Sequence, residues 1–140
     1  MGEHYHKKET LMEILVLICL HVIADFVLQT QSMATNKYLP GRKAAGWCTL
    51  HVLVYTTTVC TFMGLMNEQF WSLTCYGLVF LPHWLIDRYG LALCLMKLNG
   101  MAARVESKKP LEQAFGAIVY VILDQTLHAI SLSLLYLWVF

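Results

Sequence analysis

The sequence predicts an all-α polytopic membrane protein, a four-helix transmembrane bundle that forms a single domain over residues 1–140. Composition is the first reason: 58% of the residues are apolar and 14% are charged, whereas a soluble globule carries roughly a quarter charged residues. The second reason is that four apolar stretches reach the roughly 20 residues that a helix needs to cross a bilayer. The third is that short loops separate them, which favours antiparallel neighbours.

The four predicted spans cover residues 11–31, 46–66, 70–96 and 115–140. Turn-forming residues separate them: Pro40-Gly41 after the first, Asn67-Glu68-Gln69 after the second, and Asn99-Gly100 with Lys108-Lys109-Pro110 after the third. The segment from Leu91 to Arg104 has two interpretations. It either extends the third span or lies along the membrane surface.

Basic residues indicate the orientation of the bundle. The first connection contains Lys37, Arg42 and Lys43 without an acid, the third is also rich in Lys and Arg, and the second offers only Glu68. By the positive-inside rule, the first and third connections face the cytoplasm and both termini face outward. The net charge of +1 gives no indication of nucleic-acid binding.

Ionisable residues occur inside every predicted span, although such residues are costly in a bilayer and usually mark a functional site. Three pairs are spaced four residues apart, so the members of each pair share one helical face, about 5–6 Å from each other. Together with one further histidine they give seven donors in the cytoplasmic half of the bundle: His21, Asp25, His51, His83, Asp87, Asp124 and His128. This pattern permits one shared site. The alternative is that each side chain makes only a structural hydrogen bond between helices.

The donor types suggest which ion the site would hold. Imidazole and carboxylate without thiolate suit zinc, manganese or non-haem iron, as one or two divalent ions. The five cysteines stand singly in apolar stretches, with no CxxC pair, and so indicate neither disulfides nor a thiolate site. In a catalytic version of the site, the candidate catalytic residues are Asp25, Asp87, Asp124, Gln29 and Gln125, the two glutamines orienting ligands or water.

The motifs resemble those of a known family. The run from His21-Val-Ile-Ala-Asp25 through Gln29 to Met33-Ala-Thr-Asn36-Lys37 resembles the opening of a family of small inner-membrane proteins of bacteria and phages, catalogued as a domain of unknown function. Three further motifs resemble those of the same family: a histidine early in the second helix, an HxxxD motif in the third and an Asp-Gln-x-x-His motif in the fourth. Here they correspond to His51, His83-Trp-Leu-Ile-Asp87 and Asp124-Gln125-Thr-Leu-His128. The resemblance covers most of the chain. A more distant similarity is to membrane-bound metal-dependent hydrolases, and what both resemblances imply is a metal site.

The leading hypothesis, in line with these resemblances, is a metal-dependent hydrolase embedded in the cytoplasmic half of a bacterial inner membrane. Lys37, Arg42 and Arg88, near the cytoplasmic mouth, could attract a lipid headgroup or phosphate, so a lipid or phosphoester substrate fits. The alternatives are a transport protein for protons, other ions or the metal itself, a haem-binding bundle, and a phage or bacterial protein that binds a host membrane complex. A homo-oligomer or a membrane-protein partner is compatible with each of them.

Overall fold

The computed structural model describes residues 2–139, and the side chains of residues 10–138. Its elements are α1 (Gly2–Val22), the π-helical turn η1 (Ile23–Val27), α2 (Gln31–Asn36), α3 (Arg42–Gly64), the 3-10 turn η2 (Glu68–Trp71), α4 (Leu73–Tyr89), α5 (Leu91–Leu98), α6 (Ala102–Val105) and α7 (Pro110–Val139). No strand occurs among the described residues, which confirms the predicted all-α class.

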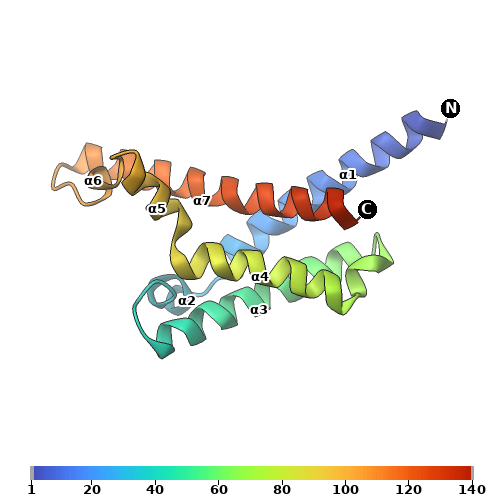
Figure 1. Ribbon diagram of the computed structural model, residues 1–140, viewed down its shortest axis with the longest axis horizontal. Helices are drawn as coiled ribbons and strands as arrows, with labels where there is room; N and C mark the ends of the chain where they lie inside the picture. Colours follow the sequence, from blue (N-terminus) through green and yellow to red (C-terminus); the bar gives the residue numbers. More distant parts are fainter. Residues whose placement is uncertain (1, 140) are drawn as a thin grey trace.

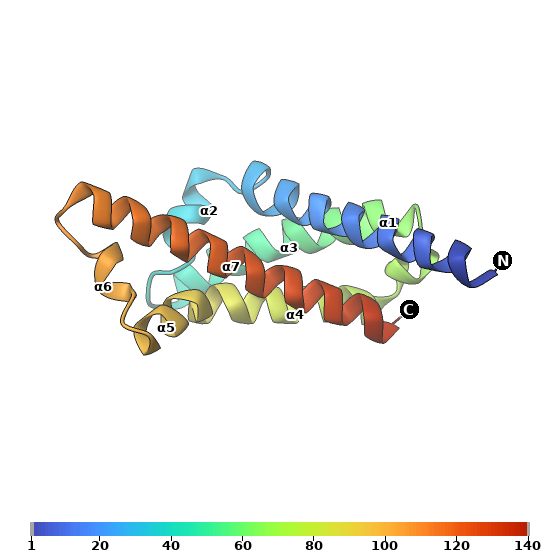
Figure 2. The same cartoon turned by 90° about the horizontal axis from the view of Figure 1, so that it is seen from above.

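Four long helices form the body of the molecule. Helix α1 packs on α3, α3 on α4, α4 on α7, and α7 on α1, so the four close a ring around one interior. Figures 1 and 2 show them running along the long axis, with the two termini at one end and α2, α5 and α6 at the other. The first and third connections therefore share one end of the bundle. That this end faces the cytoplasm remains a prediction.

Two segments are long and apolar enough to cross a membrane, Thr10–Val27 and Pro110–Trp138. Helices α4 and α5 together give a third candidate if a span bent by 50° is counted. Helix α3 is not a candidate, although it has 23 residues, because it begins with Arg42-Lys43 and carries five threonines. Length and composition thus support two or three spans among the described residues, fewer than the four predicted.

The third predicted span, residues 70–96, is broken in the structure. Gly90 adopts the left-handed conformation, with φ at 57°, and ends α4 as a glycine after a helix commonly does. The apolar sequence continues, but as α5 in a new direction, followed by α6. The region from Leu91 to Arg104 is therefore a bent pair of short helices. Helix α6 lies so close to α7 that a Cβ on Gly116 would come within 2.7 Å of the Arg104 backbone.

Polarity in this bundle is inverted relative to a soluble protein. Large apolar side chains are exposed on the outer faces of Thr10–Val27 and α7, among them Leu11, Leu15, Val22, Phe26, Ile118, Ile122, Leu134 and Trp138. The described histidines and aspartates of the long helices and η1 lie inside, among them His51 and Asp87. Contact between these apolar side chains and lipid carries no free-energy cost, whereas their contact with water does. The arrangement therefore supports membrane association.

Candidate metal centre

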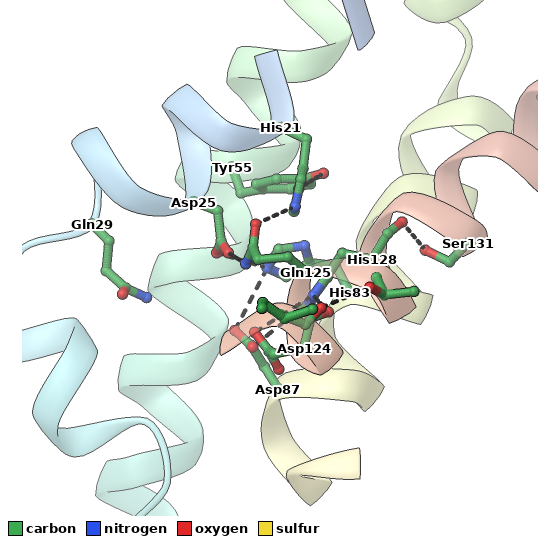
Figure 3. A network of polar contacts seen from close by, with 12 residues as sticks. His21, Asp25, Gln29, Tyr55, His83, Asp87, Asp124, Gln125, His128 and Ser131 are labelled. Atoms are coloured by element: carbon green, nitrogen blue, oxygen red, sulfur yellow. Dashed lines mark hydrogen bonds and ion pairs between the residues drawn. The ribbon is translucent and has the colours of Figure 1, made fainter. Parts of the chain in front are cut away.

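The seven histidines and aspartates predicted as donors meet in one interior layer. Each is at most 7% exposed: His21 from α1, Asp25 from η1, His51 from α3, His83 and Asp87 from α4, and Asp124 and His128 from α7. Figure 3 shows side chains from these helices pointing toward one another rather than outward. All four walls of the bundle contribute, which the sequence permitted but did not require.

A local distortion positions the first carboxylate. After His21 the α-helix widens into the π-helical turn η1, where the Leu28 amide donates to the Ile23 carbonyl at 3.2 Å. Single π-turns are rare and occur frequently at functional sites, because they re-aim one side chain. Here the turn contains Asp25, whose Oδ1 lies 3.0 Å from His51 Nε2 on α3.

Four donor atoms form a compact set, which we call the four-donor set: Asp25 Oδ1, His51 Nε2, His83 Nε2 and Asp87 Oδ2. His51 Nε2 lies 3.0 Å from the Asp25 oxygen and 3.2 Å from both the Asp87 oxygen and His83 Nε2. His83 Nε2 lies 3.6 Å and 3.5 Å from the same two oxygens. The remaining pair, Asp25 and Asp87, is within 4.8 Å. Five of the six edges are thus close to those of one regular tetrahedron, and the sixth is at most 4.8 Å.

The dimensions of this tetrahedron fit a metal ion. A tetrahedron with edges of about 3.3 Å has its centre about 2.0 Å from each corner, the distance at which Zn²⁺ binds imidazole nitrogen and carboxylate oxygen. Hydrogen bonds alone satisfy the same four atoms poorly. Gln29 Nε2 lies 3.2 Å from His51 Nδ1, and with the amide in this orientation His51 carries its proton on Nε2, where a single N–H faces three acceptors. A metal ion on Nε2 would take the place of that proton, with the Gln29 amide turned so that its Oε1 accepts from Nδ1–H. One cation can satisfy all four donor atoms at once.

Lys37 adds a positive charge to the same cluster. The residue ends α2, is 3% exposed, and its Nζ donates to Asp87 Oδ2 at 2.8 Å. Three buried carboxylates, Asp25, Asp87 and Asp124, thus face one ammonium group. With neutral histidines, the cluster carries two uncompensated negative charges. One divalent cation would neutralise them.

A chain of hydrogen bonds orients Asp25 from behind. Gln125 Nε2 donates to Asp25 Oδ2 at 2.6 Å, and Gln125 Oε1 accepts from His21 Nε2 at 2.8 Å. This leaves His21 Nδ1 to accept from the Tyr55 hydroxyl at 2.9 Å. Both ring nitrogens of His21 are therefore engaged, and His21 supports Asp25 through Gln125. Such outer partners fix the geometry of metal ligands.

The α7 side of the cluster is less well satisfied. His128 Nδ1 donates to the Asp124 main-chain carbonyl at 2.9 Å. His128 Nε2, Asp87 Oδ1 and Asp124 Oδ1 are buried and have no hydrogen-bond partner among the described residues. His128 also lies within 4.8 Å of donor atoms of His21 and Asp25, which gives a second group of compatible donors.

The predicted anion-attracting residues are placed differently from one another. Lys37 lies inside the cluster, as an ion pair with Asp87. Arg88 uses its Nη1 to donate to the Leu39 carbonyl at 3.2 Å, at the end of α4, and Arg42 is exposed at the start of α3. The two arginines thus lie outside the cluster, on the same end of the bundle as α2.

The role of Tyr55 and the burial of Lys37 were not predicted from the sequence. Tyr55 is fully buried, with its ring centroid 3.8 Å from that of His83. Its position four residues after His51 on the same helical face was a usable signal. No comparable signal existed for Lys37, because its burial depends on how the first connection folds back over α3.

Comparison with known proteins gives one match. A family model described as "Protein of unknown function (DUF3307)" matches residues 14–140. No curated protein and no solved structure matches the chain.

Proposed function

This chain belongs to the DUF3307 family, whose function is unknown, and from that premise we propose that it is a membrane-embedded, metal-dependent hydrolase. In this proposal Asp25, His51, His83 and Asp87 hold a divalent ion, and zinc, manganese and iron are the candidates. Gln29 and Gln125 orient His51 and Asp25.

The observation that carries the proposal is the four-donor set itself. Donors from η1, α3 and α4 converge at edges of 3.0–3.6 Å, and His51 offers one proton to three acceptors. The same set brings donor atoms of two buried carboxylates, Asp25 and Asp87, within 4.8 Å of each other, which costs free energy unless positive charge offsets it, and Lys37 supplies only one such charge. Catalysis or metal binding would explain why the fold bears that cost.

Hydrolysis is the reaction class that this donor set supports best. A divalent ion on histidines and carboxylates, when bound, lowers the pKa of a water ligand to about 7 and so supplies a nucleophile at neutral pH. Residues of the chain balance the charge and orient the ligands. Lys37 balances charge on Asp87, and the Gln125 amide holds Asp25 in one orientation.

The distribution of charge favours a site over a transport path. Among the described residues, every buried ionisable Asp, His and Lys belongs to this one cluster. Beyond it, toward the end of the bundle that carries η2, the interior is mainly apolar, with Val59, Met63, Phe70, Val79 and Leu132 among its members. A polar contact there is the Tyr136 hydroxyl, which donates to the half-buried Glu13 of α1. A proton or ion relay needs polar steps toward both ends. The cluster instead ends against an apolar core, as a binding or catalytic pocket can.

The membrane setting forms part of the proposal. Two spans are supported directly, and α3 and the bent pair α4–α5 complete a four-helix transmembrane bundle because they pack between those spans. With the end carrying α2 in the cytoplasm, Arg42 and Arg88 would lie at the headgroups of a bacterial inner membrane. An anionic lipid or another phosphoester is then the proposed substrate class.

Elemental analysis of the detergent-purified protein tests the metal part of the proposal. We expect wild type to retain a transition metal, and His51→Ala and His83→Ala to lose it. Glu68→Ala is the matched control, since Glu68 is an exposed acid in η2 at the opposite end from α2. Metal content of wild type indistinguishable from that of His51→Ala would overturn the proposal.

Turnover tests the hydrolase part separately. The reloaded protein is reconstituted into vesicles of phosphatidylglycerol, and headgroup release is followed by ³¹P NMR, with bis(p-nitrophenyl) phosphate as a soluble probe. We expect release that a chelator stops and that His83→Ala lacks. Metal-dependent ion flux through the vesicle wall without release of either product would contradict a hydrolase and favour transport.

A further inference from the structure

We propose that the cluster holds a second divalent cation beside the first, between His128 Nε2 and Asp87 Oδ1, so that Asp87 bridges the two ions. The inference rests on the proposed function, since it takes the four-donor set as the site of the first ion. It assigns a role to the α7 side of the cluster, which the first ion does not use.

His128 is held in the protonation state that a metal ligand needs. Its Nδ1 lies 2.9 Å from the main-chain carbonyl of Asp124, which can only accept a hydrogen bond. The proton of the neutral ring is therefore on Nδ1, and Nε2 presents a lone pair. A histidine that donates one N–H to a backbone carbonyl and offers the other nitrogen is the usual arrangement in metal sites.

The lone pair faces another acceptor. His128 Nε2 lies 3.9 Å from Asp87 Oδ1, and neither atom has a hydrogen-bond partner within the described part of the chain. Their separation is too long for a hydrogen bond, so a proton placed between them would serve neither well. One ion can reach both atoms, because two ligands each at about 2.0–2.2 Å from a metal lie at most about 4.4 Å apart. His128 is 1% exposed and Asp87 is 0% exposed, so both groups point into the interior.

Asp87 is placed to join the two positions. Its Oδ2 belongs to the four-donor set and accepts from Lys37, while its Oδ1 turns toward α7. Asp25 is shared in a similar way, because its donor atoms fall within 4.8 Å both of the His51 group and of the His21 and His128 group. Shared carboxylates between ions about 3.5–4 Å apart are typical of two-metal hydrolytic sites.

The second ion narrows the substrate class. The cluster carries two uncompensated negative charges, which the first divalent ion neutralises. A second ion would leave an excess of positive charge, and a hydroxide together with an anionic substrate oxygen would offset it. A phosphoester meets this requirement and a neutral ester does not, so the proposal points to phosphoester substrates.

Manganese loading followed by EPR tests the second ion without an activity assay. Titration of the detergent-purified wild type with Mn²⁺ is expected to reach about two ions per chain, with the spectrum of a magnetically coupled pair. His128→Gln is expected to bind about one ion per chain and to give the spectrum of isolated Mn²⁺. Thr126→Ala, an exposed residue on the same helix, is the matched control and should behave as wild type.

The outcomes separate this inference from the proposed function. Saturation of wild type at one uncoupled ion per chain, unchanged in His128→Gln, would overturn the second ion and leave the hydrolase proposal intact. Absence of any Mn²⁺ binding by wild type, along with absence of Zn²⁺ and Fe²⁺ binding, would overturn both. The wild-type titration needs no variant, so the test stands even if His128→Gln does not fold.

Discussion

The interior of the bundle has two halves of opposite character. Along α3, His51 and Tyr55 give way to Val59 and Met63 within one or two turns, and along α7 His128 is followed by Leu132. The apolar half packs as an ordinary core. The polar half places three carboxylates and four histidines in the same narrow interior. The difference indicates that the apolar half stabilises the fold, whereas the polar half costs stability, a cost that the proposed metal binding would explain.

The largest effect is expected from removing the counter-charge of Lys37. Asp87→Ala leaves a buried ammonium without its partner, which typically costs about 3–5 kcal/mol, and it removes a donor from the four-donor set. Thermal unfolding in detergent should show the loss. Replacing the pair together, as Lys37→Met with Asp87→Leu, should recover most of the stability but none of the metal binding. A double variant that bound metal as wild type does would contradict the role of Asp87.

Truncation in the apolar half sharpens the contrast. Met63→Ala, at a residue with 0% exposure, should cost about 2–5 kcal/mol of unfolding free energy through the cavity it leaves. Metal content per folded protein should stay unchanged, because Met63 lies more than three helical turns from His51 along α3. A variant that kept its stability but lost its metal would show that the two halves are not separate in function.

Metal binding should offset the loss of unfolding free energy that the polar half causes. At a free concentration of 100 times its Kd, a ligand that binds only the folded state adds about 2.7 kcal/mol to the unfolding free energy. We expect Zn²⁺ or Mn²⁺ to raise the Tm of wild type and of Met63→Ala equally. In His83→Ala the same additions should leave the Tm where it was, and a rise there would indicate binding elsewhere.

The smallest effect is expected from changing a residue that supports the four-donor set without belonging to it. Tyr55→Phe removes the hydroxyl that donates to His21 and should cost about 0.5–1.5 kcal/mol. The loss of this support should weaken metal affinity by less than the roughly 10-fold to 100-fold typical of a direct partner of a metal ligand, because Tyr55 acts on Asp25 only through His21 and Gln125. Competition with a chromophoric chelator measures the affinity. Thr57→Ala, a hydroxyl on the exposed face of the same helix, is the control.

The sequence predicted the chemistry of the cluster better than the course of the chain. Spacing of four residues placed His83 with Asp87 on one face of α4, and it depended only on helical geometry. The break at Gly90 could not be inferred, because the apolar run continues through it and only the left-handed backbone reveals the turn. The π-turn at Asp25 has no sequence signal of comparable strength.

Helix α3 shows why the span count was harder to predict. Its length and its two flanking turns made it resemble a membrane span, yet its threonines and basic start make it less apolar than the two supported spans. A helix whose polar face lines a site inside the bundle needs fewer apolar residues than one that faces lipid all round. The burial of Lys37 was hidden for a related reason, since it arises from tertiary packing of α2 on α3.

The central claim is that imidazoles and carboxylates from separate helices surround one cation. X-ray absorption at the metal edge of the loaded, detergent-purified protein tests it most directly, because that measurement sees only the shell around the ion. We predict nitrogen and oxygen ligands at about 2.0–2.2 Å with the outer-shell scattering of at least two imidazoles. A shell of sulfur, or one without imidazole scattering, would contradict the account.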